Sequence, residues 1–356
     1  MKVFKRHSKL MPWIFASLFA LAGLNVHAGC LDQKRLTGVN LAGAEFNSRK
    51  LPGTVFKDYT YPKSKEMAYI AAQGANIIRL PFRWERLQHE LNSPLDAAEL
   101  ERIQNAITQA QQENLCVLLD VHNYAKYYGN PIESAEAQDA FVSLWFKLAK
   151  ELNNPDYVAL GLMNEPAYIS LADWAALAKR TLTELRKTGS THLVMVGGGG
   201  WNGLHSWFSE KNGISNAKAF AGLKDPLKRT VIEVHQYADQ YYSGTKLDCY
   251  TPDHFNPRFE RIAQWAQEND LKLFLGEFGM AATDACLQTL ERFLQLMEGD
   301  EWKGWTYWAA GGWWGNYPFA LNTNADTPSA QWAPLKNHFY QDENASPPLP
   351  PENSLQ

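Results

Sequence analysis

Short apolar runs alternate with longer amphipathic segments along the chain, and this alternation repeats eight times. The apolar runs cover residues 36–43, 76–82, 115–124, 157–166, 192–200, 230–237, 271–279 and 302–312. Between them lie segments with apolar residues at helical spacing, clearest at 96–114, 135–152, 171–187 and 284–299. Strands that are apolar throughout are typical of a parallel sheet covered on both faces. The pattern therefore predicts an α/β protein.

The number of repeats indicates which α/β architecture to expect. Eight strand–helix units in roughly 300 residues fit a (β/α)8 TIM barrel better than an open doubly wound sheet. No G-x-G-x-x-G motif follows the first run, and the glycines at 197–200 lack the Lys-Ser/Thr ending of a phosphate loop. We expect a single-domain (β/α)8 barrel over residues 29–341.

The two ends of the chain differ from the barrel in composition. A basic stretch is followed by the apolar segment 11–24 and by Val-His-Ala before Gly29, which predicts a signal peptide over residues 1–28 and secretion to the extracellular space or periplasm. The apolar segment is shorter than a bilayer span of about 20 residues, so no membrane span is expected. Cys30 leaves open an outer-membrane lipoprotein anchored through its thiol. Residues 342–356 are proline-rich, which predicts a disordered tail.

Charge and cysteine content exclude several classes. Without residues 1–28 the chain has 30 basic and 38 acidic residues, a balance that argues against nucleic acid as a partner. The four cysteines form no C-x-x-C pair, so a zinc site is not expected. In an oxidising compartment Cys249 and Cys286 are the expected disulfide. Cys116, inside an apolar run, is predicted to be a buried thiol, and Cys30 to be free or lipidated. We expect a monomer.

Polar residues stand at the carboxyl ends of six of the predicted strands. In a (β/α)8 barrel these ends meet at one mouth, where the chemistry takes place. Buried polar groups need partners, so this many polar residues at one mouth predict a site rather than packing. The residues are Arg79, His122, Asn123, Asn164, Glu165, His235, Tyr237, Glu277 and Trp308.

The central pair is Glu165 and Glu277, after the fourth and seventh predicted strands, which places the two carboxylates across the barrel mouth. Glycoside hydrolysis requires such a pair, because one group protonates the leaving oxygen while the other attacks or activates water. Arg79 and Tyr237 offer a cation and a hydroxyl that would hold one carboxylate ionised. The pKa of the other carboxyl group must be raised if it is to keep its proton.

Several motifs together resemble glycoside hydrolase family 5, the cellulase family. They are NIIRLPF, DVHNY, GLMNEP, EVHQY, LGEFG and YWAAGGWWGNY, and the stretch EVHQYADQYYSGTKLDCYTPD is similar to the secreted endo-β-1,4-glucanases of that family. The resemblance implies that Glu165 is the general acid/base, that Glu277 is the nucleophile, and that the anomeric configuration is retained.

The same resemblance implies roles for the neighbouring residues. Asn164 would bind the sugar 2-hydroxyl, and Arg79 and Tyr237 would orient the ionised Glu277. The family also implies a further set that binds the substrate at the point of cleavage. These residues are His122 and His235, which bind the sugar or tune the acid/base, and Trp308, which stacks under the sugar in the −1 subsite.

Tryptophans outside these motifs divide into two groups. Trp145 and Trp265 fall in helical segments and are predicted to be core residues. A second group follows the fifth and eighth strands and is predicted to offer flat faces on which glucose rings stack. These candidates are Trp201, Trp207, Trp313 and Trp314.

We therefore expect a cofactor-free endo-β-1,4-glucanase acting on cellulose and related β-glucans. Three alternatives remain at this point. The same mechanism could act on mannan, xyloglucan or mixed-linkage glucan. A metal-dependent barrel hydrolase would use His122, His235, Glu165 and Glu277 as ligands, but no H-x-H motif marks the first strand. A non-catalytic carbohydrate-binding barrel would be expected to lack one of the two glutamates, and both are present.

Overall fold

The computed structural model describes residues 29–341, and their central feature is a closed barrel of eight parallel strands. The strand order around the barrel is β1-β10-β9-β8-β7-β6-β3-β2. The strands are β1 (Leu36–Leu41), β2 (Ile77–Phe82), β3 (Cys116–Val121), β6 (Val158–Gly161), β7 (Leu193–Gly197), β8 (Thr230–His235), β9 (Lys272–Glu277) and β10 (Trp302–Ala310). Each lies within one of the eight predicted apolar runs, so the predicted (β/α)8 barrel is confirmed.

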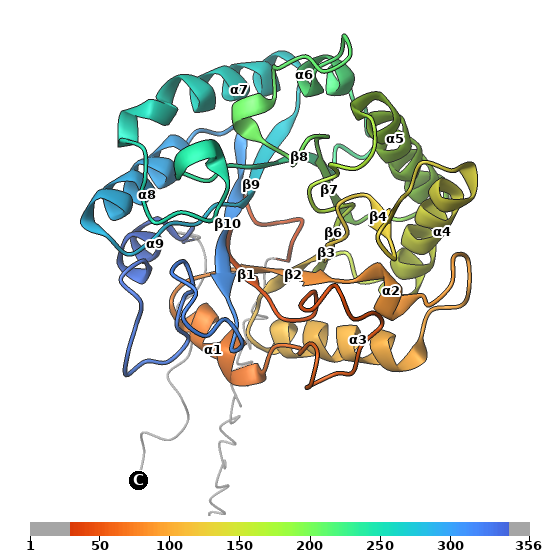
Figure 1. Cartoon of the computed structure of the whole chain (residues 1–356), viewed down its shortest axis with the longest axis horizontal. Coiled ribbons are helices and arrows are strands. Elements are labelled where there is room, and N and C mark those ends of the chain that lie inside the picture. Colours follow the sequence, from red (N-terminus) through yellow and green to blue (C-terminus); the bar gives the residue numbers. More distant parts are fainter. Residues whose placement is uncertain (1–28, 342–356) are drawn as a thin grey trace, which may run out of the picture. The chain divides into compact units, whose positions relative to one another are not determined.

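Helices surround the strands, as Figure 1 shows in a view into the barrel. They are α1 (Ser64–Ala72), α2 (Trp84–Leu87), α3 (Ala97–Gln112), α4 (Ala135–Glu151), α5 (Leu171–Lys187), α6 (Asn216–Phe220), α7 (Asn256–Glu268), α8 (Asp284–Leu296) and α9 (Trp332–His338). A short hairpin, β4 (Lys126–Tyr127) and β5 (Asn130–Pro131), stands between β3 and α4. The side chains of Asp96, Ser134, Ser170 and Thr283 cap four helices by accepting a backbone N–H.

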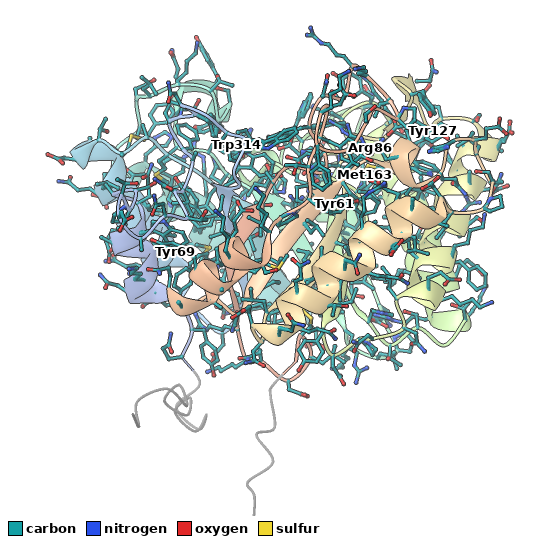
Figure 2. All side chains as sticks on the ribbon, turned by 90° about the horizontal axis from the view of Figure 1, so that it is seen from below. Tyr61, Tyr69, Arg86, Tyr127, Met163 and Trp314 are labelled. Atoms are coloured by element: carbon teal, nitrogen blue, oxygen red, sulfur yellow. A yellow bond between two sulfur atoms is a disulfide. The ribbon has the colours of Figure 1, made fainter. Side chains whose placement is uncertain are left out.

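Apolar side chains pack in two layers. The larger lies between the strands and the helices and includes Trp145 and Trp265, as predicted. A smaller cluster fills the amino-terminal end of the barrel with residues such as Leu118, Met195 and Phe274. Because apolar side chains fill the amino-terminal end, we expect the reactive polar groups at the carboxyl ends of the strands. In the side view of Figure 2, Met163 and Trp314, which follow β6 and β10, both lie toward the upper edge.

The structure changes the predicted cysteine pairing. Cys249 and Cys286 form the expected disulfide, with their Cα atoms 5.3 Å apart. Cys30 and Cys116 form a second disulfide, with Cα atoms 5.2 Å apart. The predictions that Cys116 is a buried free thiol and that Cys30 is free or lipidated are therefore wrong, because each sulfur is already bonded to the other. Cys30 is fully buried in the cluster at the amino-terminal end of the barrel, and it meets β3 there.

The ends of the chain were predicted to be a signal peptide (1–28) and a disordered tail (342–356). Both segments lie outside the described residues, so the signal peptide, the disordered tail and the domain boundaries they set stay predictions. From Gly29 to Gln341, no helix has the length and apolar character required to cross a bilayer.

Candidate active site

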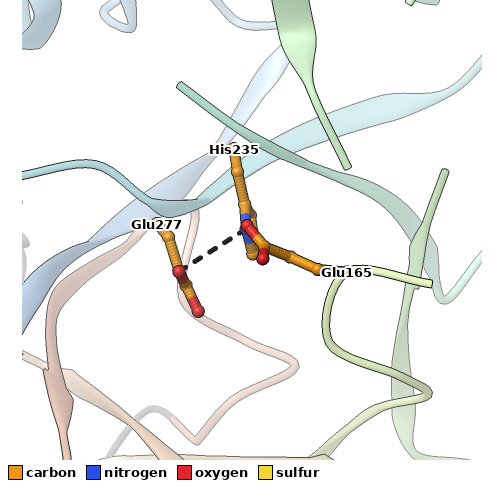
Figure 3. A group of neighbouring side chains, drawn as sticks. All are labelled: Glu165, His235 and Glu277. Carbon is orange, nitrogen blue, oxygen red and sulfur yellow. Dashed lines mark hydrogen bonds and ion pairs between the residues drawn. The ribbon is translucent and has the colours of Figure 1, made fainter. Parts of the chain in front are cut away.

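Glu165 and Glu277 meet at the carboxyl end of the barrel. Glu277 is the last residue of β9, and Glu165 follows β6 in the loop toward α5. One oxygen of each carboxylate and a ring nitrogen of His235 all lie within 4.8 Å of one another. Figure 3 shows His235 and both carboxylates pointing toward one another. The Glu165 side chain is 16% exposed and the Glu277 side chain 5%, so solvent reaches the pair mainly from the Glu165 side.

His235, the last residue of β8, links the two carboxylates. Its Nδ1 lies 3.0 Å from Glu165 Oε1 and 3.6 Å from Glu277 Oε2, while Nε2 lies 3.3 Å from Glu233 Oε1. Burial by itself would lower the pKa of His235, but the carboxylates of Glu277, Glu165 and Glu233 raise it to about 10. The carboxylates thus favour the charged imidazolium, in which Nδ1 donates a hydrogen bond to Glu165 and Nε2 donates one to Glu233.

Arg79 lies beneath this pair on β2 and is fully buried. Its guanidinium donates to Glu277 Oε1 at 2.8 Å and to Asn164 Oδ1 at 2.9 Å. Further partners surround it on the neighbouring strands: Asn40 Oδ1 at 2.9 Å, Glu233 Oε1 at 3.1 Å and Asp120 Oδ1 at 3.2 Å. Burial opposes the charge on Arg79, yet Asp120, Glu233 and Glu277 raise its pKa above the ordinary value. The guanidinium is thus a permanent cation fixed against Glu277.

Glu277 is held by a cation on one oxygen and a hydroxyl on the other. Arg79 donates to Oε1, and the Tyr237 hydroxyl donates to Oε2 at 3.0 Å. Burial raises the pKa of the Glu277 carboxyl above its usual range, and the positive charges of His235 and Arg79 oppose that rise. The structure therefore brings Arg79 and Tyr237 to the carboxylate at the position where the sequence analysis placed them.

His122, just after β3, is an uncharged partner of the same cluster. Burial lowers the pKa of His122 to about 3, so its ring is neutral. Its Nδ1 lies 2.7 Å from Asp120 Oδ2, and its Nε2 lies 3.2 Å from Asn164 Nδ2 and 3.1 Å from the Tyr124 hydroxyl. Because an amide nitrogen can only donate, Nε2 must accept and Nδ1 must carry the hydrogen. Asn164 is therefore fixed between Arg79 and His122.

Asn123 is the one predicted strand-end residue that serves the fold. Its Oδ1 accepts the backbone N–H of Trp84, and its amide nitrogen donates to Glu85 and to the carbonyl of Lys126. These bonds attach β3 and the hairpin to α2. Within residues 29–341 its hydrogen-bond partners do not include Glu165 or Glu277.

Three buried residues of the network were missed by the sequence analysis: Asn40 on β1, Asp120 on β3 and Glu233 on β8. A signal existed for two of them. Asp120 and Glu233 each stand two positions before a predicted site histidine, and residues two apart on a strand point to the same face. Gly276 is a further residue that the sequence analysis missed. It leaves room for the Glu233 side chain, because a Cβ at position 276 would lie 2.0 Å from Glu233 Oε1.

The candidate stacking tryptophans separate by exposure. Trp308 is 9% exposed and stacks near the His122 ring, with centroids 5.5 Å apart. Trp201 and Trp313 are 46% and 42% exposed, and Trp314 is partly buried against Trp308. Trp207 is fully buried against Phe220 and Trp265, so its prediction as a stacking face is wrong. Phe220 and Trp265 pack against the Trp207 ring and cover it.

Two hollows open at this end of the barrel. One, of about 360 Å³, adjoins Glu165 and is lined by residues that include Arg83, Tyr124, Tyr168 and Trp201. The other, of about 640 Å³, is lined by residues that include Trp313, Tyr61 and Tyr69. Aromatic faces beside polar groups suit sugar rings, which present C–H faces and hydroxyl edges.

A metal ion could in principle use Glu165, His235 and Glu277, because these residues cluster as ligands would. A metal requires a neutral imidazole with a free lone pair. Neighbouring carboxylates raise the pKa of His235 to about 10, so a metal would have to displace a proton from the ring. The trio fits proton transfer and charge stabilisation better than metal binding.

A closed (β/α)8 barrel with two carboxylates this close across its mouth defines a glycoside hydrolase of the two-carboxylate class. The sequence model of "Cellulase (glycosyl hydrolase family 5)" matches residues 39–312. This chain belongs to glycoside hydrolase family 5, the cellulase family.

Individual relatives agree with this assignment. The Endoglucanase gh5-1 of Neurospora crassa is 30% identical over 82% of this chain and 73% of its own length. A triple mutant of the endo-β-1,4-glucanase of Xanthomonas axonopodis pv. citri superposes with a TM-score of 0.83 at 45% identity, covering 86% of this chain and 99% of that one. XacCel5A in complex with cellopentaose has the same TM-score at 46% identity, covering 85% and 99%.

Proposed function

We propose that this protein is a retaining endo-β-1,4-glucanase that cleaves internal bonds of cellulose and related β-glucans with Glu165 and Glu277. The observation that carries the proposal is the close approach of the two carboxylates, with oxygens within 4.8 Å across the barrel mouth. Retaining glycosidases hold their carboxyl groups about 5–5.5 Å apart, whereas inverting enzymes leave roughly 6.5–9.5 Å for a water molecule.

In the first step the ionised Glu277 attacks the anomeric carbon while Glu165 protonates the departing glycosidic oxygen. A covalent glycosyl–Glu277 ester forms, and the carbon–oxygen bond to the leaving sugar breaks. Arg79 and Tyr237 hold Glu277 in a single orientation by donating to its two oxygens. Holding the nucleophile in place supplies part of the rate enhancement, because little reorientation is then needed.

In the second step Glu165, now a carboxylate, takes a proton from water, and that water displaces Glu277 from the anomeric carbon. Two displacements on opposite faces return the β configuration. His235 donates to Glu165 and lies 3.6 Å from Glu277, so its positive charge stabilises whichever carboxylate is ionised at each stage. Asn164, fixed by Arg79 and His122, presents its amide to the sugar 2-hydroxyl.

The proposed substrate follows from relatives and from the aromatic faces. XacCel5A, 46% identical, was solved with cellopentaose, a β-1,4-linked glucose oligomer. Trp308 would stack under the sugar at the point of cleavage, and the outer subsites would use the exposed Trp201 and Trp313 and the partly buried Trp314. The proposed enzyme needs no cofactor or metal and is a secreted monomer.

A substrate panel tests the proposal. Reducing sugar released from carboxymethylcellulose, glucomannan, xyloglucan and barley β-glucan should be highest on the unbranched β-1,4-linked glucans. Viscosity of carboxymethylcellulose should fall early, because internal cleavage shortens chains faster than removal of end groups. Activity on mannan or xyloglucan alone would show that cellulose is not the substrate, although the proposed mechanism would stand.

A further inference from the structure

A further pocket lies at the amino-terminal end of the barrel, away from the two catalytic glutamates. It has a volume of about 480 Å³, and its lining comes from the first described segment and from the starts of β7, β8, β9 and β10. Six of its side chains are cationic and two are acidic. The cations are Lys34, Arg35, Lys228, Arg229, Lys272 and Lys303, and the acids are Asp32 and Asp300. This basal pocket contrasts with the rest of a chain whose sequence is net acidic.

Backbone carbonyls hold several of these cations in place without neutralising them. Arg229 donates to the carbonyl of Thr191 at 2.9 Å, and Lys272 to the carbonyl of Asp300 at 2.8 Å. Arg35 donates to carbonyls at residues 297–299, and Lys303 to the carbonyl of Gln33. A carbonyl fixes the position of a cation but carries no net charge. The basal pocket therefore keeps an ordered excess of positive charge.

Acidic partners offset only part of that excess. Lys34 pairs with Asp300 at 3.2 Å, and both side chains are more than 60% exposed. Lys228 pairs at 2.8 Å with Asp270, which is also exposed. Exposed pairs of this kind add little stability, so a stronger anion can displace them.

Burial works against the positive charge of one of these cations, Lys303. Lys303 is partly buried, and burial lowers the pKa of its ammonium to about 8, with Asp32 opposing the shift and Lys272 adding to it. A bound anion would stabilise the charged form of Lys303. Trp302 also lines the basal pocket, and its buried indole N–H has no acceptor among residues 29–341.

We propose that the basal pocket binds a phosphate-type anion. Several lysine ammonium groups from separate strands can share the oxygens of one tetrahedral phosphate, which carries more charge than a carboxylate. The volume is large enough for a phosphorylated organic group. Two sources present this chemistry, an anionic phospholipid headgroup and a free phosphate.

The test uses the chain from Gly29 onward and two probes, phosphatidylglycerol–phosphatidylcholine vesicles and inorganic pyrophosphate. Variant Lys34→Gln/Lys228→Gln/Lys272→Gln removes three exposed cations of the pocket. If the parent protein binds a probe, this variant should bind that probe with an affinity lower by about tenfold or more. A charge-matched control replaces three exposed lysines outside the pocket lining: Lys57→Gln, Lys150→Gln and Lys336→Gln. This control should bind like the parent.

The outcomes separate the two sources. Vesicle binding that the pocket variant loses assigns a lipid headgroup, and pyrophosphate binding without vesicle binding assigns a free phosphate. Unchanged turnover of carboxymethylcellulose verifies folding, because the catalytic pair lies at the other end of the barrel. If the triple variant is unstable, Lys272→Gln alone should show a smaller loss in the same direction. Equal losses in the control variant, or no binding of either probe, would overturn the proposal.

Discussion

At the scale of single residues, the site depends on which groups carry charge. Three positive or donating groups, Arg79, His235 and Tyr237, face Glu277, while Glu165 is hydrogen-bonded to His235. Glu277 is the more buried of the two carboxylates, and it is the one held by a permanent cation. This asymmetry supports Glu277 as nucleophile and Glu165 as acid/base.

The acid/base role predicts a selective loss of activity. Glu165→Ala should lower kcat on carboxymethylcellulose about 10²–10⁴-fold, because the leaving oxygen is no longer protonated. Glycosylation by a dinitrophenyl cellobioside, whose leaving group needs little protonation, should be largely kept. Added azide should then speed turnover and give a β-glycosyl azide, detected by NMR. Equal loss on both substrates would contradict the assignment, and Glu277→Ala, inactive on both, is the control.

The hydroxyl of Tyr237 predicts a shift in pH dependence. Removing it in Tyr237→Phe takes a donor from the Glu277 carboxylate, so the already raised pKa of Glu277 should rise further. Activity requires the ionised form, and it is lost as the pH falls through that pKa. The acidic limb of kcat/KM should therefore move to higher pH, by about one unit for one hydrogen bond to a charge. Tyr241→Phe, at a residue 75% exposed, should leave the limb in place, and a downward shift in Tyr237→Phe would refute the argument.

At the scale of elements, loops after the strands hold the site residues in place. The segment after β8 is organised by the buried carboxylate of Asp239. This carboxylate accepts from the Ser243 hydroxyl at 2.6 Å and from three backbone N–H groups, at Gly244 (2.9 Å), Thr245 (3.0 Å) and Lys246 (2.9 Å). Gly244 in turn packs against the Tyr237 ring, where a Cβ would lie 2.9 Å from a ring carbon. The loop therefore packs closely against the ring whose hydroxyl donates to Glu277.

This arrangement predicts that Asp239 acts on the reaction through Tyr237. Asp239→Ala should lower kcat/KM on soluble cellulose about tenfold and move the acidic limb of the pH profile in the same direction as Tyr237→Phe. Asp248→Ala removes an exposed acid from the same segment and should change neither property. If Asp239→Ala lowers only the melting temperature, the carboxylate serves stability alone.

Some elements could be predicted from the sequence and others could not, for physical reasons. Buried parallel strands are apolar along their whole length, so eight apolar runs were enough to predict the barrel and the strand ends that carry Glu165 and Glu277. Asp120 and Glu233 were missed because they stand inside those runs, and the cation that permits their burial, Arg79, lies on another strand. Trp207 is buried because the segment after β7 packs it against other aromatic residues. The spacing of apolar residues along the sequence does not predict that packing.

At the scale of the whole molecule, the two ends of the barrel have separate duties. The carboxyl ends of the strands carry the chemistry, and the amino-terminal end carries the Cys30–Cys116 disulfide and the basal pocket. The pairing of Cys30 with Cys116 was out of reach of the sequence because 86 residues separate the two, and only the completed barrel brings them together.

This separation predicts that stability and catalysis can be changed independently. Cys30→Ser/Cys116→Ser should lower the free energy of unfolding by about 2–4 kcal/mol, measured by urea titration, because the unfolded chain gains freedom. Its kcat at low temperature should match that of the parent. Cys249→Ser/Cys286→Ser removes the other disulfide, in the segment that follows the Asp239 loop, and is expected to lower kcat/KM as well. A large loss of kcat in the first variant would contradict the separation.

Double displacement through Glu277 can be tested by the configuration of the first product. Proton NMR spectra recorded in the first minutes of cello-oligosaccharide hydrolysis, before mutarotation, report the anomer that leaves the enzyme. We expect the β-anomer signal to rise first and the α-anomer signal to follow only at the rate of mutarotation. An initial α-anomer signal would mean a single displacement by water and would contradict the role of Glu277 as nucleophile.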